Sequence, residues 1–103
     1  MTSKVTLNIP QNAKSLVLNL TNNKGVLTSV RVAITNLKQD GPTPAEEVVY
    51  DKVLYITGRS RITLEYPLQQ VEYLDKSAPT ALQISINSAS NHTDAGYSFT
   101  YRS

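Results

Sequence analysis

Strict alternation of apolar and polar residues in short segments is the feature of this chain that most constrains its fold. The segments are rich in Val, Ile, Thr and Tyr, and residues such as Asn, Gly, Pro and Ser separate them. Successive side chains of a β-strand point to opposite faces, so a period of two predicts half-buried antiparallel strands. We expect about eight strands from this pattern. They centre on Val5/Leu7/Ile9, Leu16/Leu18/Leu20, Val30/Val32/Ile34, Val53/Tyr55, Ile62/Leu64/Tyr66, Val71/Tyr73, Leu82/Ile84/Ile86 and Tyr97/Phe99/Tyr101.

Turn-forming residues fill the gaps between these strands, because they tolerate positive φ or bond their own backbone. The turns are NNKG at 22–25, TGRS at 57–60, DKSAPT at 75–80 and SASNHTDAG at 88–96. Short, closely spaced strands predict a single antiparallel β-sandwich with immunoglobulin-like or jelly-roll topology. With 103 residues, of which 40% are hydrophobic, the chain is expected to form one domain, 1–103, whose core needs no metal or disulfide.

One segment also carries a helix signal. Thr43, Pro44 and Glu46 match a capping box with proline at the first helical position. Against this, the following VVY and VLYI are rich in β-branched and aromatic residues, which fit a pleated surface better. The sequence therefore predicts a short helix near residues 44–48 that leads into a strand beyond Val48.

The two halves of the chain share short stretches in the same order. SKVTLNIP at 3–10 returns as SRITLEYP at 60–67, TSVRVAIT at 28–35 as TALQISIN at 80–87, and ITGRS at 56–60 as FTYRS at 99–103. Duplication of one unit would explain this, as would strands that draw on a few β-forming residues. Either explanation predicts two similar four-strand halves, 3–60 and 60–103, that face each other. The first half carries an extra segment at 40–50, which we expect to be a functional loop.

Composition argues against several classes of function. The chain has no cysteine, which excludes disulfides, thiol nucleophiles and Cys-ligated metals. Its net charge is +2 and its Lys and Arg residues are scattered singly, so no nucleic-acid partner is expected. No apolar stretch approaches the roughly 18 residues of a membrane span, so we expect no membrane insertion. The four glycines lie singly in turns, which predicts no phosphate-binding loop and no cofactor.

The residues that could support catalysis or metal binding are few. His92 is the one histidine, and Asp94 follows it in a polar loop that ends in DAG. Such a loop is usually a turn stabilised by side-chain bonds to its own backbone, so no enzyme is predicted. The scattered carboxylates lack the spacing of a zinc or calcium site. The candidates for a binding loop are Asp40, Glu46, Glu47, His92 and Asp94.

Tyrosine is the most informative residue type, with six copies against one Phe and no Trp. Tyrosine supplies rigid amphipathic area on binding faces. Tyr97 and Tyr101, which alternate with Phe99, are expected to face the core. The other four cannot all face one small core, so one or two should be exposed. The candidate ligand-binding residues are Tyr50, Tyr55, Tyr66 and Tyr73, together with Arg59 and Arg61, whose alternative role is to keep an edge strand soluble.

From Leu82 onward the chain resembles the C-terminal strand pair of a CUB domain. That family has an L-x-V-x-F strand, an S-D-x-S loop and then G-F-x-x-x-Y. The matching positions here are Leu82, Ile84, Ile86, Ser88, Ser90, Gly96, Tyr97 and Tyr101. Asn87 and Ala89 depart from the pattern, and the family's cysteines and calcium-binding acids have no counterpart. The resemblance implies a β-sandwich for extracellular recognition of protein or glycan.

These observations lead to two expected functions. The first is a non-catalytic structural or protein-interaction module, such as a subunit or appended domain of an assembly, with homo-oligomers as one outcome. The alternative is a carbohydrate- or protein-binding module that uses exposed tyrosines and the 40–50 loop. The localisation is left open, with an extracellular or surface location favoured.

Overall fold

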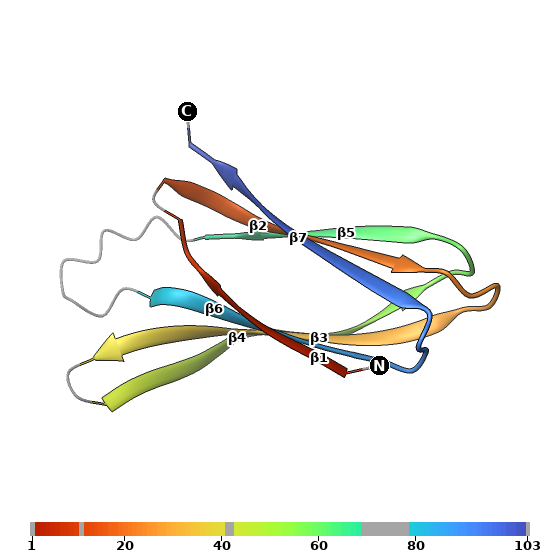
Figure 1. Cartoon of the computed structure of the whole chain (residues 1–103), viewed down its shortest axis with the longest axis horizontal. Helices are drawn as coiled ribbons and strands as arrows, with labels where there is room; N and C mark the ends of the chain where they lie inside the picture. Colours follow the sequence, from red (N-terminus) through yellow and green to blue (C-terminus); the bar gives the residue numbers. More distant parts are fainter. Residues whose placement is uncertain (1, 11, 41–42, 69–78, 103) are drawn as a thin grey trace.

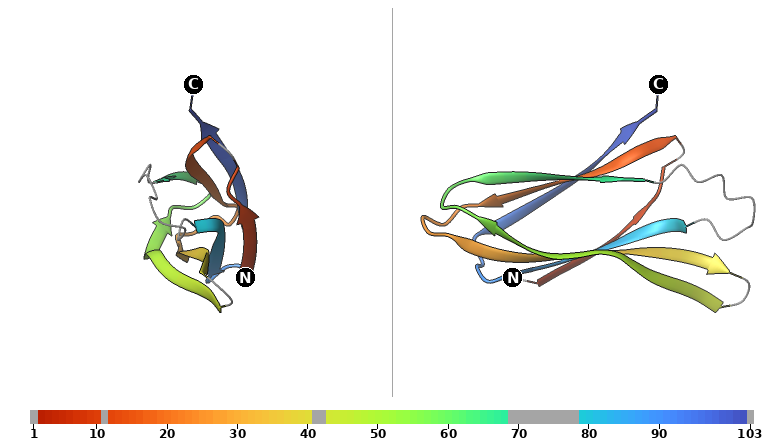
Figure 2. Two further views of the ribbon diagram at one scale, coloured as in Figure 1. Left: turned by 90° about the vertical axis from the view of Figure 1, so that its left-hand side faces the viewer. Right: turned by 180° about the vertical axis from the view of Figure 1, so that it is seen from behind.

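The computed structural model of the chain is a two-layer sandwich of antiparallel strands (Figures 1 and 2). It describes residues 2–10, 12–40, 43–68 and 79–102. The strands are β1 (Thr2–Asn8), β2 (Ala13–Asn22), β3 (Thr28–Asp40), β4 (Thr43–Ile56), β5 (Arg61–Pro67), β6 (Pro79–Ser88) and β7 (Thr93–Tyr101). The all-β antiparallel sandwich predicted from the alternation is confirmed. The eighth expected strand, at Val71 and Tyr73, lies outside the described residues.

The strands form a four-stranded sheet with the order β1-β6-β3-β4 and a three-stranded sheet with the order β5-β2-β7. Among the seven described strands, β3 and β4 are the one pair that is consecutive in sequence and also hydrogen-bonded. Each of the other connections crosses from one sheet to the other. In an immunoglobulin domain the first strand lies beside the second, whereas here β1 lies beside β6. The order is therefore not the immunoglobulin order, and jelly-roll topology stays a prediction.

The two sheets do not correspond to the two halves of the sequence. Each sheet contains strands from both 3–60 and 60–103. The strands that carry the repeated motif also differ in their pairing, because β1 pairs with β6 and its counterpart β5 pairs with β2. The halves are thus interleaved rather than stacked as separate layers. Their origin by duplication stays a prediction.

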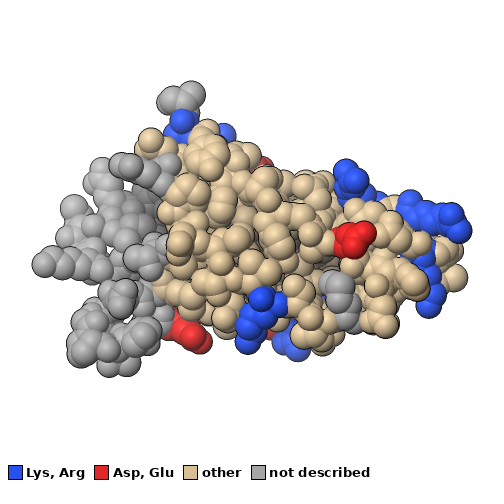
Figure 3. All heavy atoms as spheres, in the orientation of Figure 1, with Lys and Arg blue, Asp and Glu red and all other residues tan. Residues whose placement is uncertain are grey.

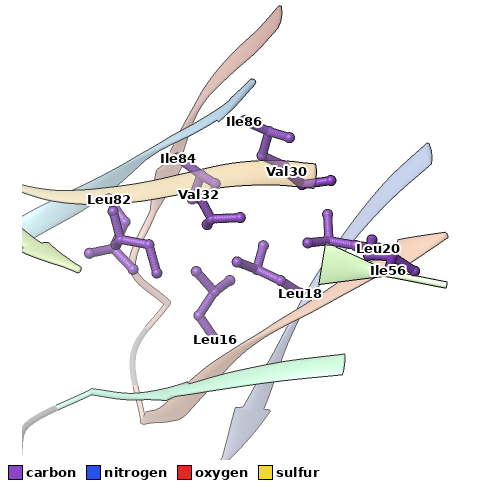
Figure 4. Packing of buried hydrophobic residues seen from close by; sticks show 10 residues of the cluster. Leu16, Leu18, Leu20, Val30, Val32, Ile56, Leu82, Ile84 and Ile86 are labelled. Atoms are coloured by element: carbon purple, nitrogen blue, oxygen red, sulfur yellow. The ribbon is translucent and has the colours of Figure 1, made fainter. Parts of the chain in front are cut away.

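The core lies between the sheets and follows the predicted alternation (Figure 4). On β2, Leu16, Leu18 and Leu20 are fully buried and point at the opposite sheet. The facing side chains come from the paired strands β3 and β6, and each side chain of this size contributes roughly 1.5–3 kcal/mol when fully buried. The fully buried cluster is Leu16, Leu18, Leu20, Val30, Val32, Ile34, Ile56, Leu82, Ile84 and Ile86.

The predicted helix near residues 44–48 is wrong, because this segment is the first part of β4. The strand pairs with β3 along its whole length, from Thr28↔Ile56 to Asp40↔Thr43. These pairs bond the backbone groups on the β3 side of the segment, which a helix would instead have bonded internally. Pro44 is compatible with a strand here, because β4 is an edge strand and one side of its backbone needs no partner. The 40–50 segment is therefore mostly strand.

A β-bulge interrupts the pairing of β3 with β4. Ile34 pairs with Tyr50, but the next residue, Thr35, pairs with Val48, so Val49 is an extra residue on β4. Val49 and Tyr50 both pack against the core as a result. The bulge shifts the alternation by one residue, which the amino-acid pattern alone did not reveal.

Candidate functional surfaces

The edge strand β4 exposes an apolar row, which we call the β4 outer row and define as Val48, Val53 and Tyr55. These side chains are 62%, 51% and 66% exposed, respectively. They pair with residues of β3 that alternate with its buried residues, so they lie on the outer face of the four-stranded sheet. An edge strand already offers unpaired backbone groups, and apolar side chains beside them make it a site for contact with another chain.

Two charged side chains beside this row, Arg31 and Asp51, are paired with each other. The Arg31 guanidinium donates Nε to Asp51 Oδ1 at 2.9 Å and Nη2 to Asp51 Oδ2 at 2.8 Å. This hydrogen bonding lowers the pKa of Asp51 and raises the pKa of Arg31. Lys52 pairs with the buried Val32 and so lies on the other face of β4, where its Nζ is 5.5 Å from the centroid of the Tyr50 ring, a cation–π distance. A partner on this surface would thus meet the Arg31–Asp51 pair already bonded.

The candidate tyrosines divide between core and surface. Tyr55 is strongly exposed, whereas Tyr50 and Tyr66 are partly buried against the core. Tyr73 lies outside the described residues. The prediction that one or two of the four are exposed is met by Tyr55 among those described. Tyr101 is 57% exposed, so the expectation that it faces the core is wrong; it lies at the end of the edge strand β7, beyond the closely packed part of the sandwich.

Tyr97 and Phe99 pack against the core, as predicted. The Tyr97 hydroxyl is buried without a hydrogen bond of normal geometry to any described group. Burial raises the pKa of Tyr97, and a contact with the Ser3 side chain opposes that shift only in part. The buried hydroxyl of Tyr97 therefore lowers the stability of the folded state locally.

A second candidate surface lies at one end of the sandwich, where the β2–β3, β4–β5 and β6–β7 loops meet (Figure 1). We call it the loop end. Backbone hydrogen bonds tie the loops together: Asn22 N to Ser60 O at 2.8 Å, Asn23 N to His92 O at 2.8 Å, and Arg59 N to Lys24 O at 2.9 Å. The loops thus form one backbone unit rather than three separate turns.

Asn22 holds this unit together from the inside. Its side chain is fully buried. Its Nδ2 donates to the carbonyl oxygens of Val26 at 2.8 Å, Ile56 at 3.1 Å and Thr57 at 3.1 Å, and its Oδ1 accepts from Lys24 N at 3.0 Å. Two glycines make a close approach between loops, since a Cβ on Gly58 would lie 2.5 Å from Gly25 O. The backbone of the loop end is consequently well fixed.

Basic side chains gather at this end, as Figure 3 shows at its right-hand side. Lys24, Arg59 and Arg61 are exposed. Arg59 has a φ of 54°, in the left-handed region, and Arg61 Nε donates to Thr21 Oγ1 at 3.3 Å. The sequence analysis proposed Arg59 and Arg61 but missed Lys24. The NNKG and TGRS turns were the available signal, but nothing local indicates that they touch.

The loop end also exposes apolar residues that the sequence analysis did not select. Val26 and Leu27, which lead into β3, are 58% and 59% exposed. The carbonyl of Val26 accepts a hydrogen bond from Asn22 Nδ2, so the backbone is held while the side chain projects outward. Exposed apolar side chains next to exposed cations distinguish this end from an ordinary polar hairpin tip.

His92 lies in the turn between β6 and β7, and Asp94 lies at the start of β7. Asp94 Oδ2 accepts from Asn23 Nδ2 at 2.6 Å, and His92 N donates to Ser90 Oγ at 3.1 Å. The Ser90 bond matches the turn interpretation given from the sequence, whereas the Asp94 bond joins the start of β7 to the β2–β3 loop. The remaining polar candidates, Glu46 and Glu47, are exposed on β4, and the side chain of Asp40 lies outside the description. The described residues contain no group of His and carboxylate side chains placed to hold a metal ion.

Comparisons with protein families, with curated proteins and with solved structures find no match to this chain. The resemblance of residues 82–103 to a CUB domain therefore stays a prediction. In the part of the chain that the structure describes, no helix has the length and apolar character needed to cross a membrane. The function must accordingly be argued from the two surfaces themselves.

Proposed function

We propose that this chain is a non-catalytic protein-interaction module that assembles with a second copy of itself through the open edge of β4. The observation that carries the proposal is the β4 outer row on an unpaired edge strand. β4 spans 14 residues, which makes it the longest described strand. A long edge strand with exposed apolar side chains favours strand addition. The proline and two glutamates of β4, which would oppose such pairing, lie at 44–47, at the other end of the strand from Val53 and Tyr55.

The proposed contact is an antiparallel pairing of β4 with β4 about a two-fold axis. In this arrangement the same surface is used by both copies, and the four-stranded sheets join into one continuous sheet. Val53 and Tyr55 of each copy then lie on the same outer face, where they are buried against the other copy. The Arg31–Asp51 pair is already bonded within each copy, so its burial leaves neither charge without a partner.

Glycan binding is the alternative, and the exposure of Tyr55 favours it. A tyrosine ring that is 66% exposed can stack on a sugar face. Tyr50 and Tyr66 are packed against the core, so the glycan surface is narrower than the four tyrosines suggested. Among the described residues, the surface available to a glycan consists of Tyr55 and its neighbours on β4.

Light scattering over a wide concentration range tests the proposal. We expect the molar mass of the protein to rise with concentration towards a dimer. The double variant Val53→Lys with Tyr55→Lys should stay monomeric, because like charges would face each other across the new strand pair. The matched control is Thr6→Lys, an exposed residue of the other edge strand of the same sheet, β1, and it should associate as the wild type does.

Two outcomes would decide against assembly. A wild-type protein that remains monomeric at all concentrations overturns the proposal. Association that survives the double variant would show that the contact lies elsewhere. A monomer that binds an immobilised glycan, and loses that binding in Tyr55→Ala with an unchanged melting temperature, would establish the alternative instead.

A further inference from the structure

We propose that the loop end docks reversibly on an anionic lipid surface. Val26 and Leu27 would enter the headgroup region, while Lys24, Arg59 and Arg61 would contact lipid phosphates and carboxylates. This inference does not depend on self-assembly through β4, because it uses different residues from different strands. It concerns peripheral contact and involves no membrane-spanning segment.

The apolar side chains of the loop end are exposed, and their backbone is held in place, before any lipid is bound. Val26 and Leu27 are adjacent, are each more than half exposed, and are carried by a loop whose backbone Asn22 fixes from within. The contact of Gly58 with Gly25 further restricts the two loops beneath the cations. Exposed apolar groups held in this way can transfer to the interface without the cost of ordering a flexible loop.

The charges point to an anionic surface. The three cations come from the β2–β3 loop, the β4–β5 loop and the start of β5, and the hydrogen bond from Arg59 N to Lys24 O joins the two loops directly. The neighbouring carboxylate, Asp94, is bonded to the amide of Asn23. Cations close to an anionic bilayer are attracted by its surface potential, and salt weakens that attraction.

Lipid fits this combination better than the other polyanions. A nucleic acid would be bound by a wider basic patch, usually with aromatic rings on which bases stack. The loop end combines three exposed cations with two exposed aliphatic residues, Val26 and Leu27, which follow Lys24 in the same loop. Aliphatic groups beside a small basic group suit the bilayer interface, where the aliphatic groups can enter the headgroup boundary and the cations can contact phosphates. Three charges predict weak binding that rises steeply as salt is lowered.

Vesicle co-sedimentation of the full chain tests this inference. One set of vesicles is pure phosphatidylcholine, and in the other about a third of the lipid is phosphatidylserine. We expect sedimentation with the anionic vesicles alone, and we expect it to fall as salt is raised. The test variants are Leu27→Ser and the double variant Lys24→Gln with Arg59→Asn. Asparagine is chosen because it tolerates the positive φ at Arg59.

The double variant should weaken vesicle binding by more than about tenfold, since each lost cation near the surface costs about fivefold. Leu27→Ser should weaken it by about tenfold, because it removes an aliphatic side chain that would enter the interface. The controls are Tyr101→Ser, an exposed aromatic residue on β7, and Lys14→Gln, an exposed cation at the opposite end of β2. They should bind vesicles as the wild type does. Melting temperatures confirm that each variant is folded, which is expected because all the changed side chains are exposed.

Three results would overturn the inference. The wild type could fail to sediment with anionic vesicles. The Leu27→Ser variant could bind as well as the wild type, which would reduce the contact to charge alone. The protein could ignore vesicles and bind a soluble polyanion such as heparin or an acidic polypeptide, which would assign the surface to another class of partner. None of these results bears on the light-scattering test of β4.

Discussion

Strands β2 and β4 have similar apolar content but differ in how far their apolar side chains are buried. β2 lies in the middle of its sheet, paired with both β5 and β7, and its apolar residues alternate cleanly into the core. β4 lies at an edge, pairs with β3 alone, and leaves the β4 outer row on the surface. The comparison teaches that alternation predicts a strand, while the strand's place in the sheet determines whether its apolar residues become core or contact surface.

The largest expected effect tests the core side of this comparison. Leu18→Ala on β2 should lower the free energy of unfolding by about 2–5 kcal/mol, because it leaves a cavity in a fully buried site. Val53→Ala on β4 should change it by about 0.5 kcal/mol or less, as an exposed position does. Urea denaturation of the two variants at a concentration where the protein is monomeric checks both values. Equal losses would mean that Val53 is part of a core and not of a free surface.

An intermediate effect on the free energy of unfolding is expected at Tyr97 of β7, which pairs with Leu18 of β2. Tyr97→Phe removes a buried hydroxyl that lacks a proper partner, so it should stabilise the protein by about 1 kcal/mol. Urea denaturation at neutral pH measures this gain. A loss of stability instead would show that the Ser3 contact is a real hydrogen bond.

The same residue predicts a pH dependence. Burial raises the folded-state pKa of Tyr97 above its unfolded value, which is about 10. The folded state therefore keeps the proton more tightly, and the associated stability is complete below the unfolded pKa and is lost as pH rises through the folded pKa. The wild type should lose more stability than Tyr97→Phe between neutral and strongly alkaline pH. Parallel losses in the two proteins would contradict this.

The smallest effect on stability is expected at Asp51, which lies on β4. The hydrogen bonds from Arg31 lower the folded-state pKa of Asp51, so their contribution is present above the unfolded pKa and is lost as pH falls through the folded pKa. The two side chains are 62% and 39% exposed, so solvent screening keeps the contribution small. The melting temperature of Asp51→Asn should be slightly below that of the wild type at neutral pH and should converge with it in acid. A constant difference at every pH would show that the charge of Asp51 is not the cause.

The fold was largely predictable because its main signal is local. The leucines of β2 and the apolar residues of β3 and β6 occupy alternate positions, and the structure buries them as expected. The helix near residues 44–48 was mispredicted because a capping box describes only the backbone groups of one helical turn, whereas here the preceding strand, β3, bonds this segment as its hairpin partner. The bulge at Val49 was missed for the same reason, since it exists only in relation to β3.

The candidate surfaces were predictable in part. Tyr55, Arg59 and Arg61 were selected from the sequence and are exposed, but Tyr50 and Tyr66 turned out to pack on the core. Val48, Val26 and Leu27 were not selected, because exposed and buried aliphatic residues look alike in a sequence. The grouping of Lys24 with Arg59 could not be read from either turn alone, because it depends on the contact between them.

By itself, the sequence determined that this chain forms antiparallel strands with a leucine- and isoleucine-rich core, because side-chain alternation is a property of each strand separately. The tertiary structure alone decided that β4 is an edge, that the bulge turns Val49 and Tyr50 inward, and that three loops meet at one end. Those features depend on which strands are neighbours. Neighbours are chosen by the burial and hydrogen bonding of the whole chain, and residues far apart in sequence contribute to that choice together.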